Sequence, residues 1–361
     1  MKIHYLVTSL ENGGAEFAIP SIIHSLQRLG CEVKVIACEP RDMKAAPKLE
    51  TANIGYEVMF DGRRSIFTCT KAYLKRIKAD RPDVIWTSLS RATLVGQLAG
   101  AFTRIPVISW KHSATVRLYT QIFRKFSKLW IADSATVESF LHDKMRIAKS
   151  NIMSWPLYYC KTLPSITHHW DGKRPLRIGS MGRLREQKNY EVLIDAIGIL
   201  LKKRPDFRQR FTLSIAGRGP LEESLKLQIK NLNLQDHIFL VGYSEHPEKF
   251  LENLDLYIQP SIFEGMCLAA HEAMAAGLPV IATPVGELAY SVINNKTGFL
   301  VSGDLKQTIG QALELLLENP QKVFLFGENA QNFVAKKFSF DRFNSASYQI
   351  VNRIRTQILK K

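Results

Sequence analysis

The chain has 361 residues, 46% of them hydrophobic and 23% charged, and this length and composition predict a globular protein with two α/β domains. No apolar run approaches the roughly 20 residues of a membrane-spanning helix, and residues 1–8 resemble a strand rather than a signal peptide, so we expect a cytosolic protein. The formal net charge is +16, and five scattered cysteines without a C-x-x-C pair argue against a disulfide framework or a zinc site.

Strands alternate with helices along the first half of the sequence. The strands are expected over 2–8, 31–37, 83–87, 105–110, 129–132 and 151–156, and the helices over 17–29, 66–78 and 92–102. This alternation predicts a parallel, doubly wound sheet. Gly13 and Gly14 follow the first strand, where glycine either lets the backbone approach a ligand or simply makes a tight turn. No G-x-G-x-x-G motif follows that strand, which speaks against a dinucleotide-dependent oxidoreductase.

The first half also carries a candidate site residue and most of the excess positive charge. His112 directly follows the strand 105–110, so it lies at the carboxyl edge of the sheet or caps a turn there. Residues 117–130 interleave aromatic and aliphatic side chains with Arg and Lys, which predicts a helix on a membrane surface or with its apolar stripe in the core. Residues 1–170 contain 24 Lys and Arg against 13 Asp and Glu, whereas residues 171–361 contain 25 against 20. This excess predicts contact with an anionic membrane or a nucleic acid, unless the surface is simply basic.

A second alternating pattern follows an irregular segment around 164–175. Its strands are expected over 176–181, 211–216, 237–243, 256–259 and 280–282, and its helices over 190–203 and 267–276. The adjacent His168 and His169 have no third ligand nearby, so we do not predict a metal site there.

The helix 267–276 has the features of an anion-binding helix. Its start leaves backbone N–H groups without intrahelical partners, and with the macrodipole these groups attract a phosphate. Glu264 precedes the helix and Glu272 lies about two turns into it, where carboxylates can accept hydrogen bonds from sugar diols; a core helix with two stray acids is the alternative. Gly277 is suited to the positive φ that ends a helix. Arg183 and Lys188 follow another strand and glycine turn, as a phosphate-binding pair or as members of a surface ion pair.

The two glutamates, separated by seven residues within E-G-M-C-L-A-A-H-E-A-M-A-A-G-L-P, resemble the signature of glycosyltransferase family 4. The Gly-Gly-Ala-Glu loop at 13–16, the Arg183 and Lys188 pair and the Gly-Arg-Gly-Pro loop at 217–220 resemble further motifs of this family. The family usually has Gly-Phe-Gly-Leu-Pro after its first Glu, whereas this chain has Gly-Met-Cys-Leu-Ala over 265–269, a change that concerns the side chains around the donor sugar. The resemblance covers nearly the whole chain.

The resemblance implies a GT-B fold, in which two Rossmann-like doubly wound domains face a cleft. The domains are expected over 1–165, together with a crossover helix over 340–361, and over 172–339. The residues implied as catalytic are His112, Glu264, Arg183 and Lys188. Those implied to bind the donor are Gly14, Arg183, Lys188, Gly217, Tyr243, Glu264, Gly265, Met266, Cys267, Leu268 and Glu272.

The expected function is retaining transfer of a hexose or N-acetylhexosamine from a nucleotide sugar, expected to be a UDP-sugar. The expected acceptor is a glycan or lipid-linked glycan in the synthesis of bacterial surface polysaccharide or lipopolysaccharide, at the cytoplasmic face of an anionic membrane. No metal or other cofactor is expected, because the chain has no D-x-D triplet, and no nucleic acid is expected as a partner. The alternatives are a nucleotide-sugar epimerase of the same fold, a basic nucleic-acid-binding protein, and a glycosidase, for which Glu264 and Glu272 would have to lie about 5 Å apart.

Overall fold

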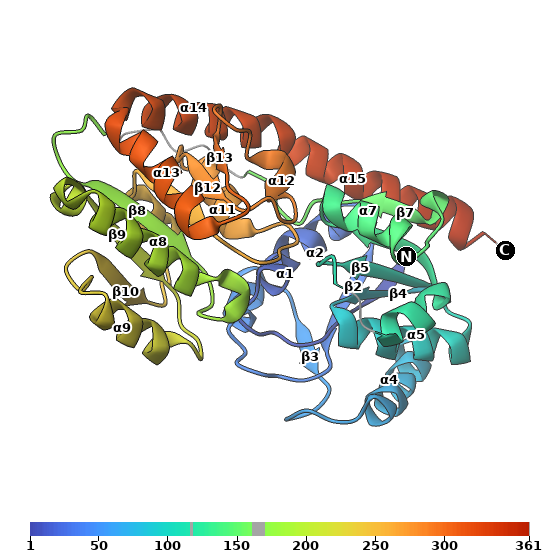
Figure 1. The fold of residues 1–361 in the computed structure, drawn as a ribbon. Helices are drawn as coiled ribbons and strands as arrows, with labels where there is room; N and C mark the ends of the chain where they lie inside the picture. Colours follow the sequence, from blue (N-terminus) through green and yellow to red (C-terminus); the bar gives the residue numbers. More distant parts are fainter. Residues whose placement is uncertain (116–117, 161–169, 361) are drawn as a thin grey trace. The chain divides into compact units, whose positions relative to one another are not determined.

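Two compact units make up the structure, a computed structural model that describes residues 1–115, 118–160 and 170–360 (Figure 1). The first unit comprises Met1–Tyr158 and Asp341–Lys361, and the second comprises Tyr159–Phe340. The expected end of the first domain at 165, the paired His168 and His169 and the start of the basic segment at 117 lie outside the described residues.

A seven-stranded parallel sheet forms the centre of the first unit, in the order β3-β2-β1-β4-β5-β6-β7. The strands are β1 Lys2–Val7, β2 Glu32–Ala37, β3 Tyr56–Val58, β4 Val84–Ser88, β5 Val107–Lys111, β6 Ser127–Ala132 and β7 Ile152–Ser154. The helices are α1 Gly14–Phe17, α2 Ile19–Arg28, α3 Ala46–Thr51, α4 Ile66–Asp80, α5 Ser90–Thr103, α6 Leu118–Ile122, η1 Arg124–Phe126, α7 Ala135–Asp143, η2 Lys149–Asn151, α15 Phe340–Arg353 and the π-helical turn η5 Ile354–Ile358. The central strands β4 and β5 are buried at every residue, because helices cover both faces of a parallel sheet.

A six-stranded parallel sheet forms the centre of the second unit, in the order β10-β9-β8-β11-β12-β13. The strands are β8 Leu176–Met181, β9 Phe211–Ala216, β10 Ile238–Gly242, β11 Leu256–Gln259, β12 Val280–Ala282 and β13 Gly298–Leu300. The helices are η3 Glu186–Lys188, α8 Tyr190–Lys203, η4 Pro205–Gln209, α9 Glu222–Asn231, α10 Pro247–Glu252, α11 Leu268–Ala275, α12 Leu288–Ser291, α13 Leu305–Glu318 and α14 Pro320–Lys337.

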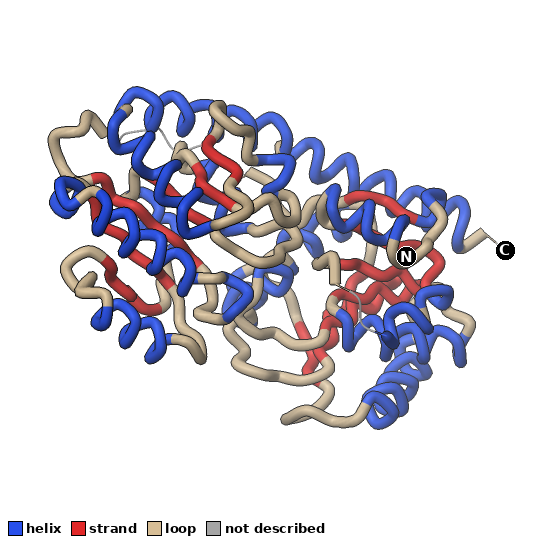
Figure 2. Tube along the Cα trace, in the orientation of Figure 1, coloured by secondary structure: helices blue, strands red, loops and turns tan. Residues whose placement is uncertain are grey.

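The predicted pair of doubly wound parallel sheets is confirmed (Figure 2). In each sheet the strand order reverses once, because β1 lies between β2 and β4, and β8 lies between β9 and β11. Open sheets of this kind bind ligands beyond the carboxyl ends of the strands that flank the reversal. The loops after β1 and β4 in the first unit, and after β8 and β11 in the second, are therefore the places to look for a site.

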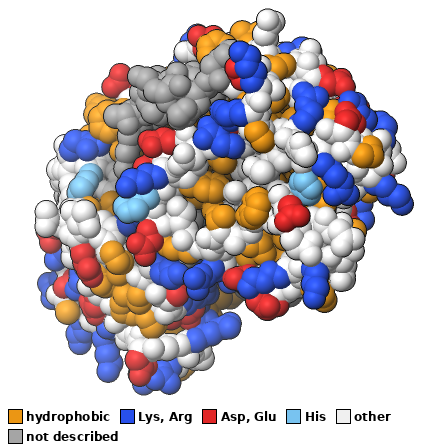
Figure 3. Space-filling view, turned by 90° about the vertical axis from the view of Figure 1, so that its left-hand side faces the viewer, with side chains coloured by type: hydrophobic (Ala, Val, Ile, Leu, Met, Phe, Trp, Pro, Cys, Tyr) orange, Lys and Arg blue, Asp and Glu red, His pale blue; other side chains and the backbone are white. Residues whose placement is uncertain are grey.

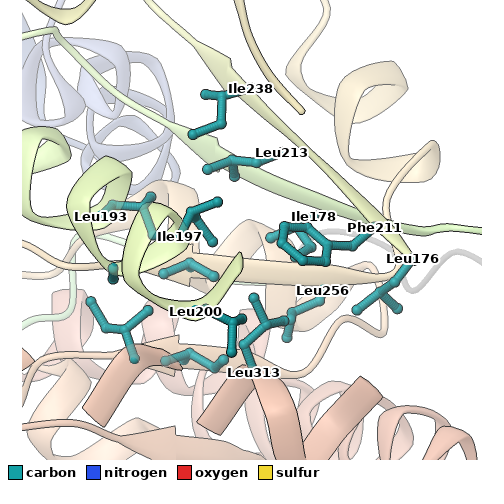
Figure 4. Close-up of a cluster of buried hydrophobic side chains, with 14 of the residues drawn as sticks. Leu176, Ile178, Leu193, Ile197, Leu200, Phe211, Leu213, Ile238, Leu256 and Leu313 are labelled. Carbon is teal, nitrogen blue, oxygen red and sulfur yellow. The ribbon is translucent and has the colours of Figure 1, made fainter. Parts of the chain in front are cut away.

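A large apolar cluster between the sheet and the helices α8 and α13 supports the second unit (Figure 4). Its members include Leu176, Ile178, Phe211, Leu213 and Leu256 from the strands, Leu193, Ile197 and Leu200 from α8, and Leu313 from α13. The α8 residues recur at spacings of three and four, so one face of this helix points at the sheet. Burial of each such side chain contributes about 1.5–3 kcal/mol, which makes the strands a stable base for the loops at their carboxyl ends.

The C-terminal helix α15 packs on the first unit. The ring of Phe343 lies 5.1 Å from that of Trp155. The hydroxyl oxygens of Ser25 and Ser347 are 2.7 Å apart and buried. These contacts tie the end of the chain to α2 and to the residue that follows β7.

The segment 117–130 was expected to be one helix, and this expectation is wrong. The helix α6 ends at Ile122, a single 3-10 turn follows, and β6 begins at Ser127. Leu129 and Trp130 are fully buried in β6, where the strand pairs with β5 and β7. Burial on both faces of a sheet outweighs the helical periodicity of the aromatic residues.

The surface carries charges of both signs. On the face shown in Figure 3, Lys and Arg side chains lie among Asp, Glu and hydrophobic side chains. All five cysteines are described, and none of them forms a disulfide. Within the described ranges, no helix combines the length and the hydropathy required to cross a bilayer.

Candidate functional site

Two loops at the carboxyl edge of the second sheet bring Lys188 and Glu264 into direct contact. Lys188 ends the turn η3 after β8, and Glu264 lies in the loop between β11 and α11. Because β8 and β11 are neighbours in the sheet, these loops lie side by side. Lys188 Nζ donates a hydrogen bond to Glu264 Oε1 at 2.7 Å. The two side chains are only 16% and 7% exposed, so this is a largely buried ion pair between two of the predicted site residues.

The ion pair fixes the charge on Lys188. Burial opposes that charge, but the facing carboxylate of Glu264 outweighs burial and raises the pKa of Lys188 above its usual range. Burial also raises the pKa of the neighbouring Cys267 thiol, and it raises the pKa of Tyr190 to about 12. Lys188 is therefore a cation at physiological pH, while the thiol and the phenol beside it are neutral. In the part of the chain that is described, no group of three or more His, Cys, Asp and Glu side chains could hold a metal ion.

Three buried polar side chains connect Glu264 to the end of β8. Ser261 Oγ donates to Glu264 Oε1 at 2.7 Å, and Gln259 Nε2 donates to Ser261 Oγ at 2.8 Å. The Tyr257 hydroxyl donates to Gln259 Oε1 at 3.0 Å and accepts from the backbone N–H of Met181 at 3.0 Å. Tyr257, Gln259 and Ser261 are fully buried. A continuous chain of hydrogen bonds therefore ends on the carboxylate of the ion pair.

Glycines allow the backbone of the loop after β9 to pack directly against the backbone of the loop after β8. Gly217 has a φ of +153°, and a Cβ there would lie 1.9 Å from the carbonyl oxygen of Gly182. A Cβ on Gly219 would lie 2.3 Å from the carbonyl oxygen of Leu184. A Cβ on Gly182 would lie 2.8 Å from Cε of Lys188. Gly217 is thus required for packing, whatever its predicted part in binding the donor.

The start of α11 has an unusual backbone. Its N-cap residue Cys267 has a φ of 55° and a ψ of 68°, the left-handed region that favours glycine. Gly265, Met266 and Cys267 are buried, and Leu268 is half-buried. The carbonyl oxygen of Gly265 accepts the N–H of Glu287 at 2.8 Å. Because the Met266 and Cys267 side chains point into the protein, a ligand would meet this segment mainly through its backbone amides.

His271 anchors this helix start from inside. Its Nδ1 is 3.0 Å from the carbonyl oxygen of Cys267, and its Nε2 is 2.9 Å from Ser291 Oγ. Burial lowers the pKa of His271 to about 4, so the ring is neutral and Nδ1–H donates to the carbonyl. The left-handed residue at the helix start is therefore held by a buried side chain one turn later.

Three more predicted donor-binding residues belong to the second unit. Arg183 lies just beyond β8, Tyr243 directly follows β10, and Glu272 lies in the second turn of α11. All three are half-buried. Arg183 and Tyr243 are thus on loops at the carboxyl edge of the sheet, and Glu272 is on the helix that leads away from it.

His112 belongs to the first unit, where it joins the ends of three strands. Its Nε2 is 2.8 Å from Oγ of Ser88, the last residue of β4, and its Nδ1 is 3.3 Å from Oδ2 of Asp133, which follows β6. The ring of Trp110 lies 5.5 Å from the imidazole ring. Ser88 is fully buried, as is the carboxylate of Asp133, whose Oδ1 has no hydrogen-bond partner among the described residues. Both imidazole nitrogens are therefore engaged within the unit.

The glycine loop after β1 is also closely packed. Gly14 is the first residue of α1. A Cβ on the preceding Gly13 would lie 2.2 Å from Oε2 of Glu16, a carboxylate that is buried against this loop. Gly14 therefore occupies a helix start at the carboxyl edge of the first sheet, at its point of strand-order reversal.

The residues that support Glu264 and His112 were not among the predicted site residues. Tyr257, Gln259 and Ser261 alternate along β11 and the loop after it, and this stripe of polar residues at a spacing of two in an otherwise apolar strand was a usable signal. Asp133 and Ser88 gave no comparable signal, because their contact with His112 depends on the alignment of three strands.

Two family models match the chain. Residues 169–333 match the model described as glycosyl transferases group 1. Residues 12–157 match the model described as glycosyltransferase family 4. The two matches together extend over most of both units.

Known proteins resemble the chain in sequence and in fold. The lipopolysaccharide core biosynthesis mannosyltransferase LpsB of Rhizobium meliloti (strain 1021) is 30% identical over 172 residues, which are 46% of this chain and 48% of LpsB. The chain thus spans about half the length of the curated relatives it matches. The crystal structure of Anabaena HepE with UDP-glucose has a TM-score of 0.82 at 20% identity and covers 98% of this chain and 100% of HepE. The lipopolysaccharide outer core galactosyltransferase WaaB in its apo form has a TM-score of 0.78 at 17% identity, with coverages of 98% and 99%.

Proposed function

The chain belongs to the group 1 glycosyl transferases of glycosyltransferase family 4 and has their GT-B fold, and on that premise we propose that it transfers a hexose or N-acetylhexosamine from a nucleotide sugar to a glycan or a lipid-linked glycan. The observation that supports this most strongly is the Lys188–Glu264 pair at the loop before α11. It places a buried cation and a carboxylate at a helix start, which is the combination that a sugar diphosphate requires.

The proposed chemistry follows from the charges that change during transfer. The bond between the sugar and the diphosphate breaks through an oxocarbenium-like state, and negative charge builds on the departing nucleotide. Lys188, Arg183 and the amides at the start of α11 stabilise that charge, while Glu264 orients the sugar and Glu272 holds the ribose. These cations take the part that a divalent metal plays in metal-dependent transferases. The acceptor hydroxyl attacks the anomeric carbon from the face that the nucleotide leaves and gives its proton to the departing diphosphate, so the anomeric configuration is retained.

We propose UDP-sugars as the first donors to test. HepE, whose fold matches this chain over 98% of its length, was crystallised with UDP-glucose. LpsB is named a mannosyltransferase and WaaB a galactosyltransferase, so hexoses are the sugars that these names support. Met266 and Cys267 replace the Phe and Gly that are usual in the family, and both side chains are buried, so the hexose is to be identified by screening.

We propose a lipid-linked acceptor in lipopolysaccharide or surface polysaccharide synthesis, at the cytoplasmic face of an anionic membrane. LpsB and WaaB carry lipopolysaccharide core names. The first unit exposes Phe102 by 74%, Ile122 by 61% and Phe126 by 46%, on α5, α6 and η1, which pack together. Exposed Arg104 and Lys125 lie in the same segments. Aromatic side chains flanked by cations suit a bilayer interface of anionic lipids.

Nucleotide binding and transfer test this function in sequence. Thermal shifts with UDP, GDP and ADP identify the nucleotide, because a ligand that binds only the folded state raises its stability. Sugar forms of that nucleotide are then incubated with and without lipopolysaccharide-core acceptors, in buffer with and without EDTA. Retained anomeric configuration in the product, with full activity in EDTA, is the expected result.

Other outcomes would point to other functions. Conversion of the nucleotide sugar to an epimer without any acceptor would replace transfer by epimerisation. Salt-sensitive binding to nucleic acid, with no stabilisation by any nucleotide, would contradict the enzyme. The proposed binding to an anionic membrane would be contradicted if the protein does not pellet with anionic vesicles, or if its pelleting does not weaken as the salt concentration rises.

A further inference from the structure

Glu264 depends on other side chains for its position. It lies between the end of β11 at Gln259 and the start of α11 at Leu268, on a stretch without regular secondary structure. The two residues before it, Ile262 and Phe263, are exposed by 57% and 43%. An irregular stretch with an exposed tip does not by itself fix a side chain. The carboxylate is nevertheless buried, and Ser261 and Lys188 both donate hydrogen bonds to it.

The hydrogen bonds that reach Glu264 run in one direction. Tyr257 accepts the Met181 N–H, and its own proton has two acceptors within reach, Gln259 Oε1 at 3.0 Å and the Met181 carbonyl oxygen at 3.1 Å. Gln259 is an amide, so it can accept from Tyr257 on one atom and donate to Ser261 with the other. Ser261 has a single proton, and after accepting from Gln259 it donates that proton to Glu264. Such a chain must end on a group that only accepts, which a carboxylate is.

Ser261 and Lys188 bind the same carboxylate oxygen of Glu264. Ser261 Oγ and Lys188 Nζ each lie 2.7 Å from Oε1 of Glu264. Two charge-assisted hydrogen bonds to one oxygen fix the rotation of the carboxylate and thus the direction of the other oxygen. Lys188 alone would not do so, because an ammonium group on a flexible stem acts as a point charge.

We propose that Ser261 and Gln259 are positioning residues for sugar transfer. They hold Oε1 of Glu264 so that Oε2 is directed at the hydroxyl groups of the donor sugar. This inference rests on the proposed function, and it adds residues that do not touch the donor. Their effect therefore falls on the sugar and not on the nucleotide.

Ser261→Ala is the test, with Gln259→Met as a second variant that breaks the same chain one bond earlier. For each protein we would measure the Kd of the nucleotide selected among UDP, GDP and ADP, and kcat with its sugar form. Loss of a hydrogen bond to a charged group predicts that kcat falls about tenfold to a hundredfold. The nucleotide Kd should stay within about twofold, since the free nucleotide has no sugar for Glu264 to orient.

Thr297→Val is the matched control. Thr297 is a buried residue of the second unit, and its hydroxyl accepts the Ile293 N–H at 2.8 Å and donates to the carbonyl oxygen of Ser291 at 3.2 Å. The variant loses a buried hydroxyl of the same unit, so it reports the cost of a destabilised unit without touching the chain to Glu264. Its kcat should stay near that of the wild type, and Ser261→Thr, which restores a hydroxyl, should recover activity.

The outcomes separate this inference from the function on which it rests. A selective fall of kcat in both variants supports it. The inference would be overturned if Ser261→Ala and Gln259→Met both keep the kcat of the wild type. It would also be overturned if their nucleotide Kd rises by the same factor by which kcat falls. A wild-type protein that binds none of the three nucleotides would instead contradict the proposed transferase.

Discussion

Replacement of Lys188 by Met removes the positive half of the buried pair and leaves Glu264 without a counterion. At a separation of 2.7 Å the gross attraction is about 6 kcal/mol for an effective dielectric constant of 20. Much of this is offset by the cost of burying two charges that are only 16% and 7% exposed. The larger effect comes from the carboxylate left behind, and breaking such a pair costs about 3–5 kcal/mol. We therefore expect Lys188→Met to lower the free energy of unfolding by about 3–4 kcal/mol.

A double-mutant cycle tests the reasoning behind this value. Urea denaturation followed by circular dichroism would be measured for Lys188→Met, for Glu264→Gln and for the two combined. Each single change leaves one buried charge unpaired, whereas the combined change leaves none, so the combined loss should fall short of the sum by at least about 1.5 kcal/mol. Losses that add within about 0.5 kcal/mol would show that the two groups do not stabilise one another.

Three further predictions concern the backbone and the buried histidine of the second unit. Because Cys267 has a left-handed backbone, Cys267→Gly should be more stable than Cys267→Ala by about 1 kcal/mol in urea denaturation, and equal stabilities would contradict the strain. Burial lowers the pKa of His271 from 6.5 to about 4, so the unfolded chain takes up a proton near pH 6.5 that the folded protein takes up only near pH 4. The stability due to this group is therefore complete above pH 6.5 and decreases by about 3 kcal/mol toward pH 4; His271→Gln should flatten this decrease, and an unchanged pH profile would refute it. Gly217→Ala should destabilise by about 3 kcal/mol, because its Cβ would lie 1.9 Å from the oxygen of Gly182, whereas Gly62→Ala, with no atom within 4 Å of the Cβ, should change the melting temperature little.

Most strands and helices of the fold could be predicted from the sequence. The strands Leu256–Gln259 and Val280–Ala282 and the helix Tyr190–Lys203 were predicted with the bounds that the structure has. Gly277 has a φ of 80°, as expected for the residue that ends α11. These elements are buried parallel strands and an amphipathic helix, and each has an unambiguous pattern of apolar residues. The helix expected over 117–130 was wrong beyond Ile122, where its aromatic residues fit a helix and a buried strand equally well, whereas the strand expected over 129–132 is present in β6.

The candidate site was less accessible from the sequence. Glu264 and Lys188 were recognisable because motif spacing marks them. Their direct contact was not, since it depends on β8 and β11 being neighbours in the sheet. Asp133 was likewise expected only as a possible helix cap, and in the structure Ser134 caps α7 while Asp133 bonds His112. Pairings between loops require the strand order, which a single sequence does not contain.

The central claim is that Lys188 stabilises the diphosphate of the donor while Glu264 orients its sugar. Steady-state turnover tests this claim most directly. Nucleotide release from the preferred nucleotide sugar would be measured with acceptor for the wild type, Lys188→Ala and Glu264→Gln, each first shown to be folded by circular dichroism. Loss of about 2–4 kcal/mol of transition-state stabilisation predicts a fall in kcat/KM of roughly thirtyfold to several hundredfold in each variant. Turnover close to that of the wild type in both variants would contradict the account.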